Sequence, residues 1–382
     1  MANENEDDVD WGYLPENLWM MVGEYVGAIS VGVDELSSWR ATNMTYLAFD
    51  IWNRACNEYD VESFEGMLPK SITGVSLNGV FKANALGSLL KELTRTQPYL
   101  VKLDFLVAMP CDSSVCRMLG QLIRCSSTLK TVSLSNQSGI LTSHVSCFIW
   151  SGLEENQSIE TLNIPNCKLG ADFTPSLGKI IRKHPSLKSL DLRGNEFGAI
   201  GVEVICDAAI ASSLQSLNLG ENMHSYEAAL TIGKLVGANT QLKELELREN
   251  KLTAVGTQFL KRALETNNTI QRLGLSYNLL ENTGAYDIAD ILVSNESLKE
   301  VQLSFNFIKQ DGLHAICAAL KVNATLQSLD LSRNLFGDVG AGDIADMFLV
   351  NTTLQKLDVR YTKLTWESGN LLRETGNCRC IL

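Results

Sequence analysis

The 382-residue sequence lacks any apolar run near the roughly 20 residues that a membrane-spanning helix needs. It also lacks an excess of positive charge, because 44 acidic residues outnumber 32 basic ones and the formal net charge is −12. Nucleic-acid affinity comes mainly from Lys and Arg neutralising phosphates, so this balance argues against a nucleic-acid-binding protein. We expect a soluble protein with no membrane span, whose acidic charge is compatible with a basic protein partner.

Catalytic motifs are missing as well. None of the four histidines has a Cys or Ser neighbour at a spacing with mechanistic meaning, and neither G-x-S-x-G nor G-x-x-x-x-G-K-[ST] occurs. His144 with Cys147 makes only half a metal site, and Cys111, Cys116 and Cys125 lack the C-x-x-C spacing of a zinc site. We therefore predict that the protein is not an enzyme and has no catalytic, cofactor-binding or metal-binding residues.

The ten cysteines do not have the positions of a disulfide framework. Cys206 and Cys317 fall at apolar positions of expected helices, which favours buried thiols in a reducing compartment. We expect a cytoplasmic location, with the nucleus as an alternative. Cys378 and Cys380 leave two readings of the C terminus open, a double-cysteine prenylation signal and a frayed tail, because Arg379 stands where the C-a-a-X signal needs cysteine.

One phrase with the pattern L-x-x-L-x-L-x-x-N recurs along the sequence at nearly constant spacing. Successive copies begin 27, 28, 28, 28, 28 and 28 residues apart. Their first residues are Leu187, Leu214, Leu242, Ile270, Leu298, Leu326 and Leu354. A period in the twenties indicates a stacked repeat array, because one unit of this size cannot bury its own apolar face. Weaker copies begin upstream at Ile159, Leu129, Leu100 and Ile72.

Each copy has the pattern of a short strand, a turn and a helix. In the copy that begins at Leu242, the alternation of Leu245 and Leu247 is typical of a strand with one buried face. An asparagine follows at the turn, where its carboxamide can satisfy backbone groups that the short strand leaves unpaired. We predict that stacking places these asparagines in one structural hydrogen-bonded ladder. The ladder comprises Asn195, Asn222, Asn250, Asn278, Asn306 and Asn334.

The second half of each copy is predicted to be helical. A glycine opens it in four copies, and apolar residues then recur at helical spacing. An Asn-x-Thr or Asn-x-Ser tripeptide ends it, beginning at Asn267, Asn295, Asn323 and Asn351. These tripeptides also match the glycosylation acceptor pattern, but we interpret them as part of the repeat.

This pattern resembles the leucine-rich repeat proteins of the ribonuclease-inhibitor type, over about residues 70 to 382. The resemblance implies an α/β fold, a right-handed leucine-rich repeat solenoid (horseshoe) with parallel strands on the concave face and helices on the convex face. About eleven strands roughly 4.8 Å apart would line an arc on the order of 50 Å, which suits a macromolecular partner. We predict an acidic disordered tail over residues 1–12, a helical segment over 13–62 and the repeat domain over 63–382.

The residues between and after the strand leucines are expected to form a partner-binding concave face. Tyr277 and Phe305 occupy equivalent positions in adjacent copies, and Arg333 continues the row. Exposed aromatic residues beside arginine are typical of binding hot spots. The alternative is that the two rings stack on each other and only shield the ladder. The predicted surface comprises Arg193, Glu221, Glu246, Arg248, Tyr277, Phe305, Arg333, Arg360 and Tyr361.

Residues 11 to about 62 differ from the repeats in composition and in sequence pattern. Four of the six tryptophans lie here, and the repeated phrase is absent. Pro15 suits the first turn of a helix, on which Leu14, Leu18 and Val22 fall on one face. A second helix is predicted over residues 36–47.

The same segment resembles an F-box, with an L-P-x-x-L opening, a helical leucine run and a tryptophan near its end. The resemblance implies binding to a Skp-type adaptor through Leu14, Pro15, Leu18, Val22 and Leu36, with Trp52 closing the small core. Two departures weaken the match: the loop before Leu36 is longer than is usual, and Thr42-Asn43 stands where the family often has Val-Ser. The alternative is a helical cap on the first repeat.

The leading hypothesis is a non-enzymatic adaptor, the substrate-recognition subunit of a Skp–cullin–F-box ubiquitin ligase. The alternatives are a regulator of small GTPases similar to the Ran GTPase-activating proteins, and a general leucine-rich repeat scaffold.

Overall fold

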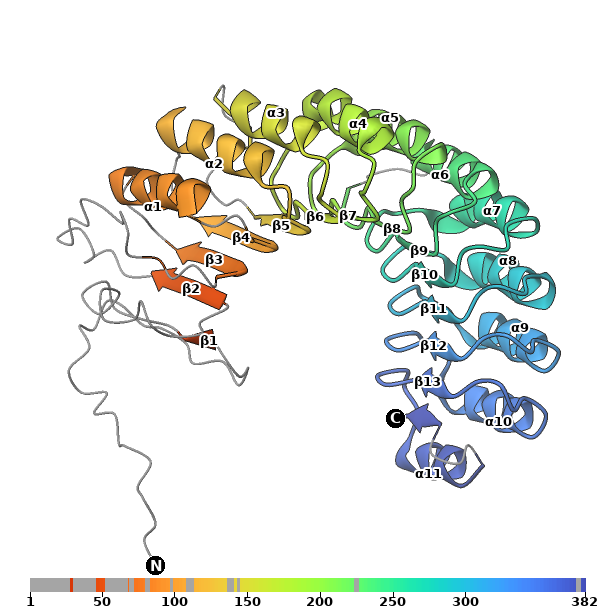
Figure 1. The fold of residues 1–382 in the computed structure, drawn as a ribbon. Helices are drawn as coiled ribbons and strands as arrows, with labels where there is room; N and C mark the ends of the chain where they lie inside the picture. The colour runs from red at the N-terminus through yellow and green to blue at the C-terminus, as the bar shows by residue number, and fades with distance from the viewer. Residues whose placement is uncertain are drawn as a thin grey trace, which may run out of the picture. The chain divides into compact units, whose positions relative to one another are not determined.

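The computed structural model describes residues 28–29, 46–51, 68, 72–79, 83–96, 99–107, 113–135, 141–142, 145–222, 227–375 and 379–382. The chain divides into two compact units, Met1–Ile159 and Glu160–Leu382. In both units short parallel strands alternate with helices (Figure 1). This confirms the predicted α/β repeat fold.

The first unit contains five strands and three helices among its described residues. The strands are β1 (Ala28–Ile29), β2 (Tyr46–Ile51), β3 (Gly74–Gly79), β4 (Lys102–Val107) and β5 (Thr131–Leu134). The helices are α1 (Ala83–Thr96), α2 (Ser113–Cys125) and α3 (Cys147–Glu155). Each strand pairs in parallel with the next one along the chain.

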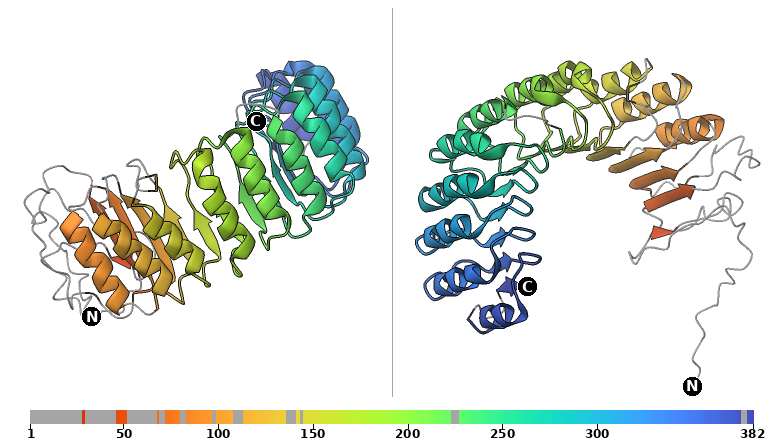
Figure 2. Two further views of the ribbon diagram at one scale, coloured as in Figure 1. Left: turned by 90° about the horizontal axis from the view of Figure 1, so that it is seen from above. Right: turned by 180° about the vertical axis from the view of Figure 1, so that it is seen from behind.

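The second unit repeats the same plan. Its strands are β6 (Thr161–Asn163), β7 (Ser189–Asp191), β8 (Ser216–Asn218), β9 (Glu244–Glu246), β10 (Arg272–Gly274), β11 (Glu300–Gln302), β12 (Ser328–Asp330), β13 (Lys356–Asp358) and β14 (Cys380–Ile381). Its helices are η4 (Ala171–Phe173), α4 (Thr174–Lys183), α5 (Gly198–Ile210), α6 (Glu227–Ala238), α7 (Thr253–Leu264), α8 (Glu281–Ser294), α9 (Gln310–Leu320), α10 (Gly337–Phe348) and α11 (Trp366–Thr375). Within this unit the helices form one layer and the strands the other (Figure 2).

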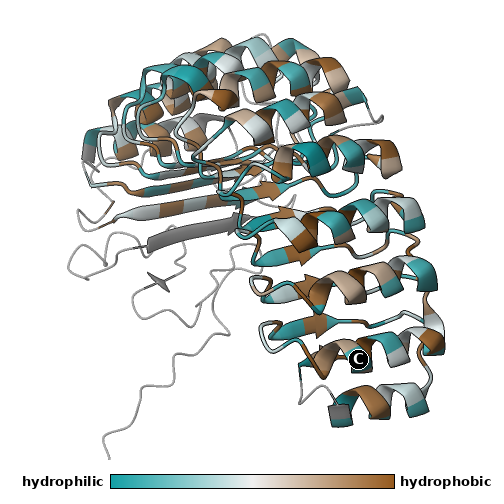
Figure 3. Ribbon diagram, turned by 90° about the vertical axis from the view of Figure 1, so that its right-hand side faces the viewer, coloured by the Kyte–Doolittle hydropathy of each residue, from teal (hydrophilic) through white to brown (hydrophobic). Residues whose placement is uncertain are grey.

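The core of the second unit lies between its strand layer and its helix layer. Leu245 and Leu247 point inward from β9 and the turn after it, and Leu260 and Leu264 point inward from α7; each is at most 1% exposed. The helices carry hydrophobic and hydrophilic positions on different sides (Figure 3). Glycines let neighbouring helices approach, since a Cβ at Gly340 would overlap the Leu313 side chain. The 28-residue period is thus the length of one strand–turn–helix unit.

The asparagine after each strand takes part in a continuous row of hydrogen bonds. The backbone N–H of Asn250 donates to Oδ1 of Asn278 at 2.9 Å, and that of Asn278 donates to Oδ1 of Asn306 at 2.8 Å. The Nδ2 group of Asn250 donates to the carbonyls of Leu219 and Leu247, both at 3.0 Å. All six predicted ladder asparagines are fully buried. Each ladder asparagine therefore forms hydrogen bonds with backbone groups of its own unit and of the preceding unit.

A second row of asparagines closes the opposite edge of the array, after the helices. Asn295 donates from Nδ2 to the carbonyls of Leu264 and Asn267, and its Oδ1 accepts the backbone N–H groups of Ser297 and Leu298. Asn323 and the equivalent positions in other repeats make the same kind of bonds. The asparagine side chains of the Asn-x-Ser/Thr tripeptides thus form hydrogen bonds within the repeats, in agreement with their interpretation as part of the repeat. They are nearly inaccessible to solvent.

His184 occupies a position of this second row, 28 residues after Asn156. Its Nδ1 accepts the backbone N–H of Ser186 at 3.4 Å, as an asparagine Oδ1 would. Its buried Nε2 has no hydrogen-bond partner among the described residues. Burial lowers the pKa of the His184 imidazole. The side chain therefore does only part of what asparagine does at this position.

We predict that His184→Asn stabilises the protein by about 1 kcal/mol at pH 7.5, because the amide supplies a donor pair that the imidazole lacks. The gain should increase below pH of about 6.5, where histidine in the unfolded chain takes up a proton that buried His184 does not. Thermal melts of both proteins at pH 7.5 and 5.5 measure this. An identical change in midpoint between the two pH values for both proteins would contradict it.

The C terminus ends the second row with a different side chain. The guanidinium of Arg379 donates to the carbonyl oxygens of Asn351 at 2.9 Å and Leu354 at 3.3 Å, and it lies 4.3 Å from the ring centroid of Phe348. Two residues, Cys380 and Ile381, form β14 and pair with β13. The structure contradicts a frayed tail for residues 379–382, because Cys380 and Ile381 pair with β13 and Arg379 donates to carbonyl oxygens of the preceding unit.

One sequence prediction is wrong in part in the first unit. A helix was expected over residues 36–47; residues 36–45 lie outside the described residues, but Leu47 lies in strand β2, where it pairs with Val75 of β3. The alternation of Leu47, Phe49 and Ile51 fits a strand, and Leu47 precedes Val75 by one 28-residue period. The parallel sheet therefore begins upstream of residue 63, where we placed the start of the repeat domain.

Candidate functional site

The turn between each strand and its helix holds residues in an unusual backbone conformation. The residue just before each ladder asparagine has a positive φ, including Tyr277 (59°), Phe305 (56°) and Arg333 (58°), and so does Tyr361 (61°) before Thr362 at the equivalent position. Glycine is the residue that adopts this conformation without cost, and Gly194 does so at the equivalent position after β7 (68°). Non-glycine side chains at this position, including Glu221 and Glu249, are thus held by the turn against their local conformational preference.

Aromatic side chains from two adjacent turns form the most distinctive feature of this edge. The rings of Tyr277 and Phe305 stack with centroids 4.4 Å apart and planes 10° apart. Phe307 packs edge-on against Phe305, at 5.7 Å and 69°. Leu279, two residues after Tyr277, is 41% exposed, and Phe305 and Phe307 are 36% and 39% exposed. We call Tyr277, Leu279, Phe305 and Phe307 the aromatic turn cluster.

Arginines lie at both sides of this cluster. The guanidinium of Arg248 lies 4.3 Å from the ring centroid of Tyr277, and that of Arg333 lies 4.7 Å from the ring centroid of Tyr361. Tyr361 is 72% exposed. The predicted row of Tyr277, Phe305 and Arg333 thus continues to Tyr361, while Arg248, which stands one residue earlier in its own turn, contacts the Tyr277 ring.

The stacking of Tyr277 on Phe305 is what the alternative interpretation described, yet it does not remove the rings from solvent. Because Phe305 remains more than a third exposed, the stack forms an accessible apolar surface. Leu279 and Phe307 also extend this surface, although neither is among the surface residues predicted from the sequence. Their positions, one residue after each ladder asparagine, repeat every 28 residues and could have been found by the same alignment of copies.

Three other predicted surface residues, Arg193, Glu221 and Arg360, take part in ion pairs. Arg193 contacts Glu221 at 2.9 Å. The guanidinium of Arg360 donates two hydrogen bonds to the Asp358 carboxylate, from Nε to Oδ1 at 3.0 Å and from Nη2 to Oδ2 at 2.6 Å. Burial alone would raise the pKa of Asp358, but these hydrogen bonds hold the pKa of its carboxyl below the usual value. These pairs satisfy their own charges and leave the aromatic turn cluster as the distinctive part of the row.

A shallow hollow of about 250 Å³ lies over strands β8 to β11. Gly274 forms part of its floor, and a Cβ there would collide with the Glu246 carboxylate. Burial raises the pKa of Glu246, while its hydrogen bond from the Arg248 backbone N–H at 2.8 Å opposes that shift. Glu246, a predicted surface residue, therefore lines the strand layer beside the turn row.

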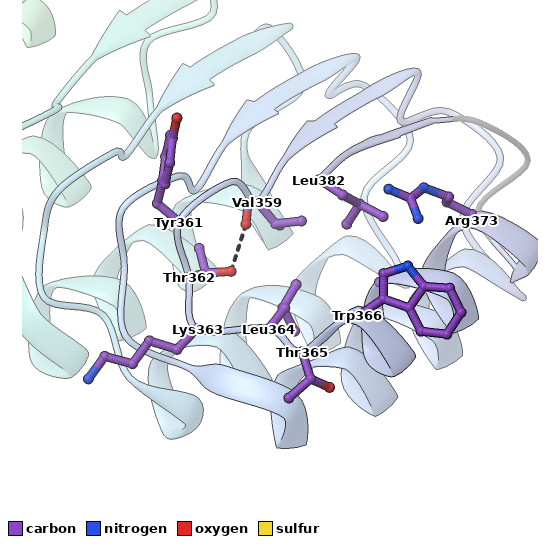
Figure 4. Close-up of a pocket in the computed structure, with 10 residues that line it drawn as sticks. Val359, Tyr361, Thr362, Lys363, Leu364, Thr365, Trp366, Arg373 and Leu382 are labelled. Atoms are coloured by element: carbon purple, nitrogen blue, oxygen red, sulfur yellow. Dashed lines mark hydrogen bonds between the residues drawn. The ribbon is translucent and has the colours of Figure 1, made fainter.

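A second cavity, of about 210 Å³, lies near the C terminus (Figure 4). Val359, Thr362, Trp366 and Leu382 are among its lining residues, and the Thr362 hydroxyl donates to the Val359 carbonyl at 2.6 Å. Thr362 stands in the asparagine position of the last full copy, so this hydrogen bond replaces part of the ladder. The lining offers no set of groups with an evident chemical task.

Within the described ranges, no three or more His, Cys, Asp or Glu side chains are grouped to hold a metal ion. Burial raises the pKa of the Cys206 and Cys317 thiols, as expected for apolar helix positions. Among the helices that the structure describes, none is both long and apolar enough to cross a membrane. The residues predicted to contact a Skp-type adaptor, namely Leu14, Pro15, Leu18, Val22, Leu36 and Trp52, lie outside the described residues.

Comparison with known proteins agrees with this geometry. A family described as "TMOD/LMOD Leucine-rich domain" matches residues 231–365, and one described as "Leucine Rich repeat" matches residues 183–206. The fold is a leucine-rich repeat solenoid. The first match includes the whole aromatic turn cluster.

Curated relatives cover a smaller part of the chain. The ribonuclease inhibitor of Sus scrofa is 28% identical over 142 residues, and that of Mus musculus is 30% identical over 151 residues. These alignments cover 36% and 38% of this chain and 31% and 33% of the relatives, so the chain spans about a third of the length of the curated relatives it matches. A solved structure, "Leiomodin-1 Actin-Binding Site 2 (ABS2)", aligns with 24% identity and a TM-score of 0.34, covering 40% of this chain and 91% of that one.

The positive φ of Phe305 gives a test of its role. We predict that Phe305→Gly is more stable than Phe305→Ala by about 1 kcal/mol, because alanine keeps the Cβ that disfavours this conformation. Urea unfolding of both variants measures the difference. Val255 in α7 is the matched control, where glycine should be about 1 kcal/mol less stable than alanine. The same order at both positions would show that the turn imposes no strain.

Proposed function

We propose that this protein is a non-enzymatic scaffold that holds a protein partner against the turn edge of its second unit. The observation that carries the proposal is the aromatic turn cluster, in which exposed rings are stacked and held in a backbone conformation that aromatic residues seldom adopt. Rigid aromatic side chains flanked by arginine are the usual composition of binding hot spots, because they bury much apolar area with little loss of entropy.

The comparisons support a protein as the ligand. The curated relatives are named as inhibitors of ribonucleases, which are themselves proteins, and the repeat architecture offers an extended edge instead of an enclosed pocket. The two hollows described above, of about 250 and 210 Å³, are small and open, which does not favour a small-molecule substrate at either of them.

The test is affinity capture with the full chain and quantitative mass spectrometry. Tyr277→Ala combined with Phe305→Ala should lower the captured amount of the specific partner at least tenfold while circular dichroism shows the same fold. The matched control combines Val293→Ala with Val322→Ala, two apolar residues that are 60% and 68% exposed near the helix C-termini. Equal capture by the aromatic variant and the wild type would refute the proposal.

A more specific role follows from the F-box resemblance of residues 13–62. We propose that the segment recruits a Skp-type adaptor, which would make the chain the substrate-recognition subunit of a cullin ubiquitin ligase acting in the cytoplasm or nucleus. The motif in the sequence supports this proposal, with Leu14, Pro15 and Leu18 as its most distinctive residues.

Binding of the purified full-length chain to a Skp-type adaptor tests this role. We expect binding by the wild type and at least a tenfold loss in Leu14→Ala combined with Leu18→Ala, because both leucines would leave the adaptor interface. Ile200→Ala, at a residue of α5 that is 74% exposed, serves as the control. If the wild type does not bind, the ligase role fails, and assays of GTP hydrolysis by Ran-like GTPases become the next step.

A further inference from the structure

We propose that the aromatic turn cluster recognises an extended segment of a protein partner with the pattern acid–x–hydrophobic–x–acid. This inference rests on the proposed protein-binding function and adds the chemistry of the partner. It follows from the charges that flank the cluster, from their spacing and from the orientation that the rings impose on them.

The two arginines beside the cluster differ from the other arginines of the row. In the described part of the chain, neither Arg248 nor Arg333 has a carboxylate within ion-pair distance, whereas Arg193 pairs with Glu221 and Arg360 with Asp358. The guanidinium groups of Arg248 and Arg333 lie over the rings of Tyr277 and Tyr361 instead. The cluster is therefore flanked by two arginines that form no ion pair within the described chain, although the Glu246 carboxylate lies close enough to Arg248 for an electrostatic interaction.

Stacking prepares these arginines for a carboxylate. A guanidinium group that lies on a ring face keeps its edge N–H donors directed outward, and those donors match the two oxygens of a carboxylate. The ring also fixes the plane of the group, so less side-chain entropy is lost when a partner binds. A negatively charged partner group is thus favoured at each end of the cluster.

The spacing of the arginines selects the spacing of the acidic groups. Arg248 follows β9 and Arg333 follows β12, which are three strand intervals apart, or about 14 Å at the usual strand separation. An extended chain advances about 3.3 Å per residue, so acidic residues at positions i and i+4 lie about 13 Å apart. In an extended chain the side chains of i, i+2 and i+4 point to the same side.

The middle residue of such a segment would face the rings. Tyr277 and Phe305 occupy the turns after β10 and β11, between the two arginines, and Leu279 and Phe307 widen the apolar surface. A leucine or aromatic side chain at i+2 would bury this surface, while the acidic side chains at i and i+4 reach the arginines. The cluster therefore favours one class of peptide and disfavours a basic one.

The probe is a fluorescein-labelled peptide, GSESLSESG, titrated with the full-length protein and followed by fluorescence anisotropy. We expect saturable binding that weakens at least tenfold when both glutamates are replaced by glutamine, and at least tenfold when leucine is replaced by serine. Arg248→Gln combined with Arg333→Gln should produce a similar loss. Arg262→Gln, at an exposed arginine of α7, should leave binding unchanged and is the matched control.

A charge exchange makes the test stricter. Arg333→Glu should weaken the original peptide but strengthen binding of one of the two peptides in which a single glutamate is replaced by lysine, and which of them gains gives the peptide direction. Equal or tighter binding of the peptide with two lysines, an unaffected arginine variant, or no saturable binding at millimolar peptide would overturn the inference.

The outcome is distinguishable from failure of the proposed function. If the Tyr277 and Phe305 variant loses its captured partner but the acidic peptide does not bind, the cluster is a protein-binding surface with a different partner chemistry. If the variant keeps its captured partner, the proposed function itself fails.

Discussion

The hydrogen bonding of buried asparagine side chains is the constraint on which the rest of this structure depends. A three-residue strand satisfies few of the backbone groups in its own turn, and an unpaired group costs about 1–3 kcal/mol when buried. The Nδ2 group of Asn278 donates to the carbonyls of Leu247 and Leu275, and its Oδ1 accepts the backbone N–H of Asn250, so one side chain satisfies backbone groups of two units. Because asparagines of the second row do the same after several helices, most repeats of the second unit are fixed at both edges, which favours a nearly constant period of 28 residues.

This constraint also creates the surface. Each ladder asparagine sits at a fixed place in a tight turn, and the residue before it is forced to a positive φ in repeat after repeat. The side chains at that position therefore stand in a row with a constant orientation and separation. Where glycine occupies the position the edge is bare, and where Tyr277 and Phe305 occupy it two rings stack. A scaffold that resists local distortion is what allows such strained aromatic residues to remain exposed.

The deviations from the pattern are as informative as the pattern itself. The sequence predicted the strands, the helices and the first asparagine row, because the 28-residue spacing was directly visible. It did not reveal that His184 and Arg379 serve the second row, since a histidine and an arginine are chemically unlike the residue they replace. Strand β2 was missed for a similar reason, because Leu47 lies one period upstream of Val75 without the asparagine that marks the later copies.

The sequence by itself determined the repeat length, the parallel strand order and the buried leucine and asparagine positions. These depend on local periodicity and on side-chain chemistry that recurs in every copy. Only the tertiary structure decided which predicted surface residues act together. Arg193 and Arg360 are neutralised by carboxylates, Arg248 and Arg333 lie on tyrosine rings, and Phe307 joins the stack. These contacts join residues from different repeats or depend on side-chain directions. The spacing of residues along the chain does not determine which of the neighbouring side chains each one contacts.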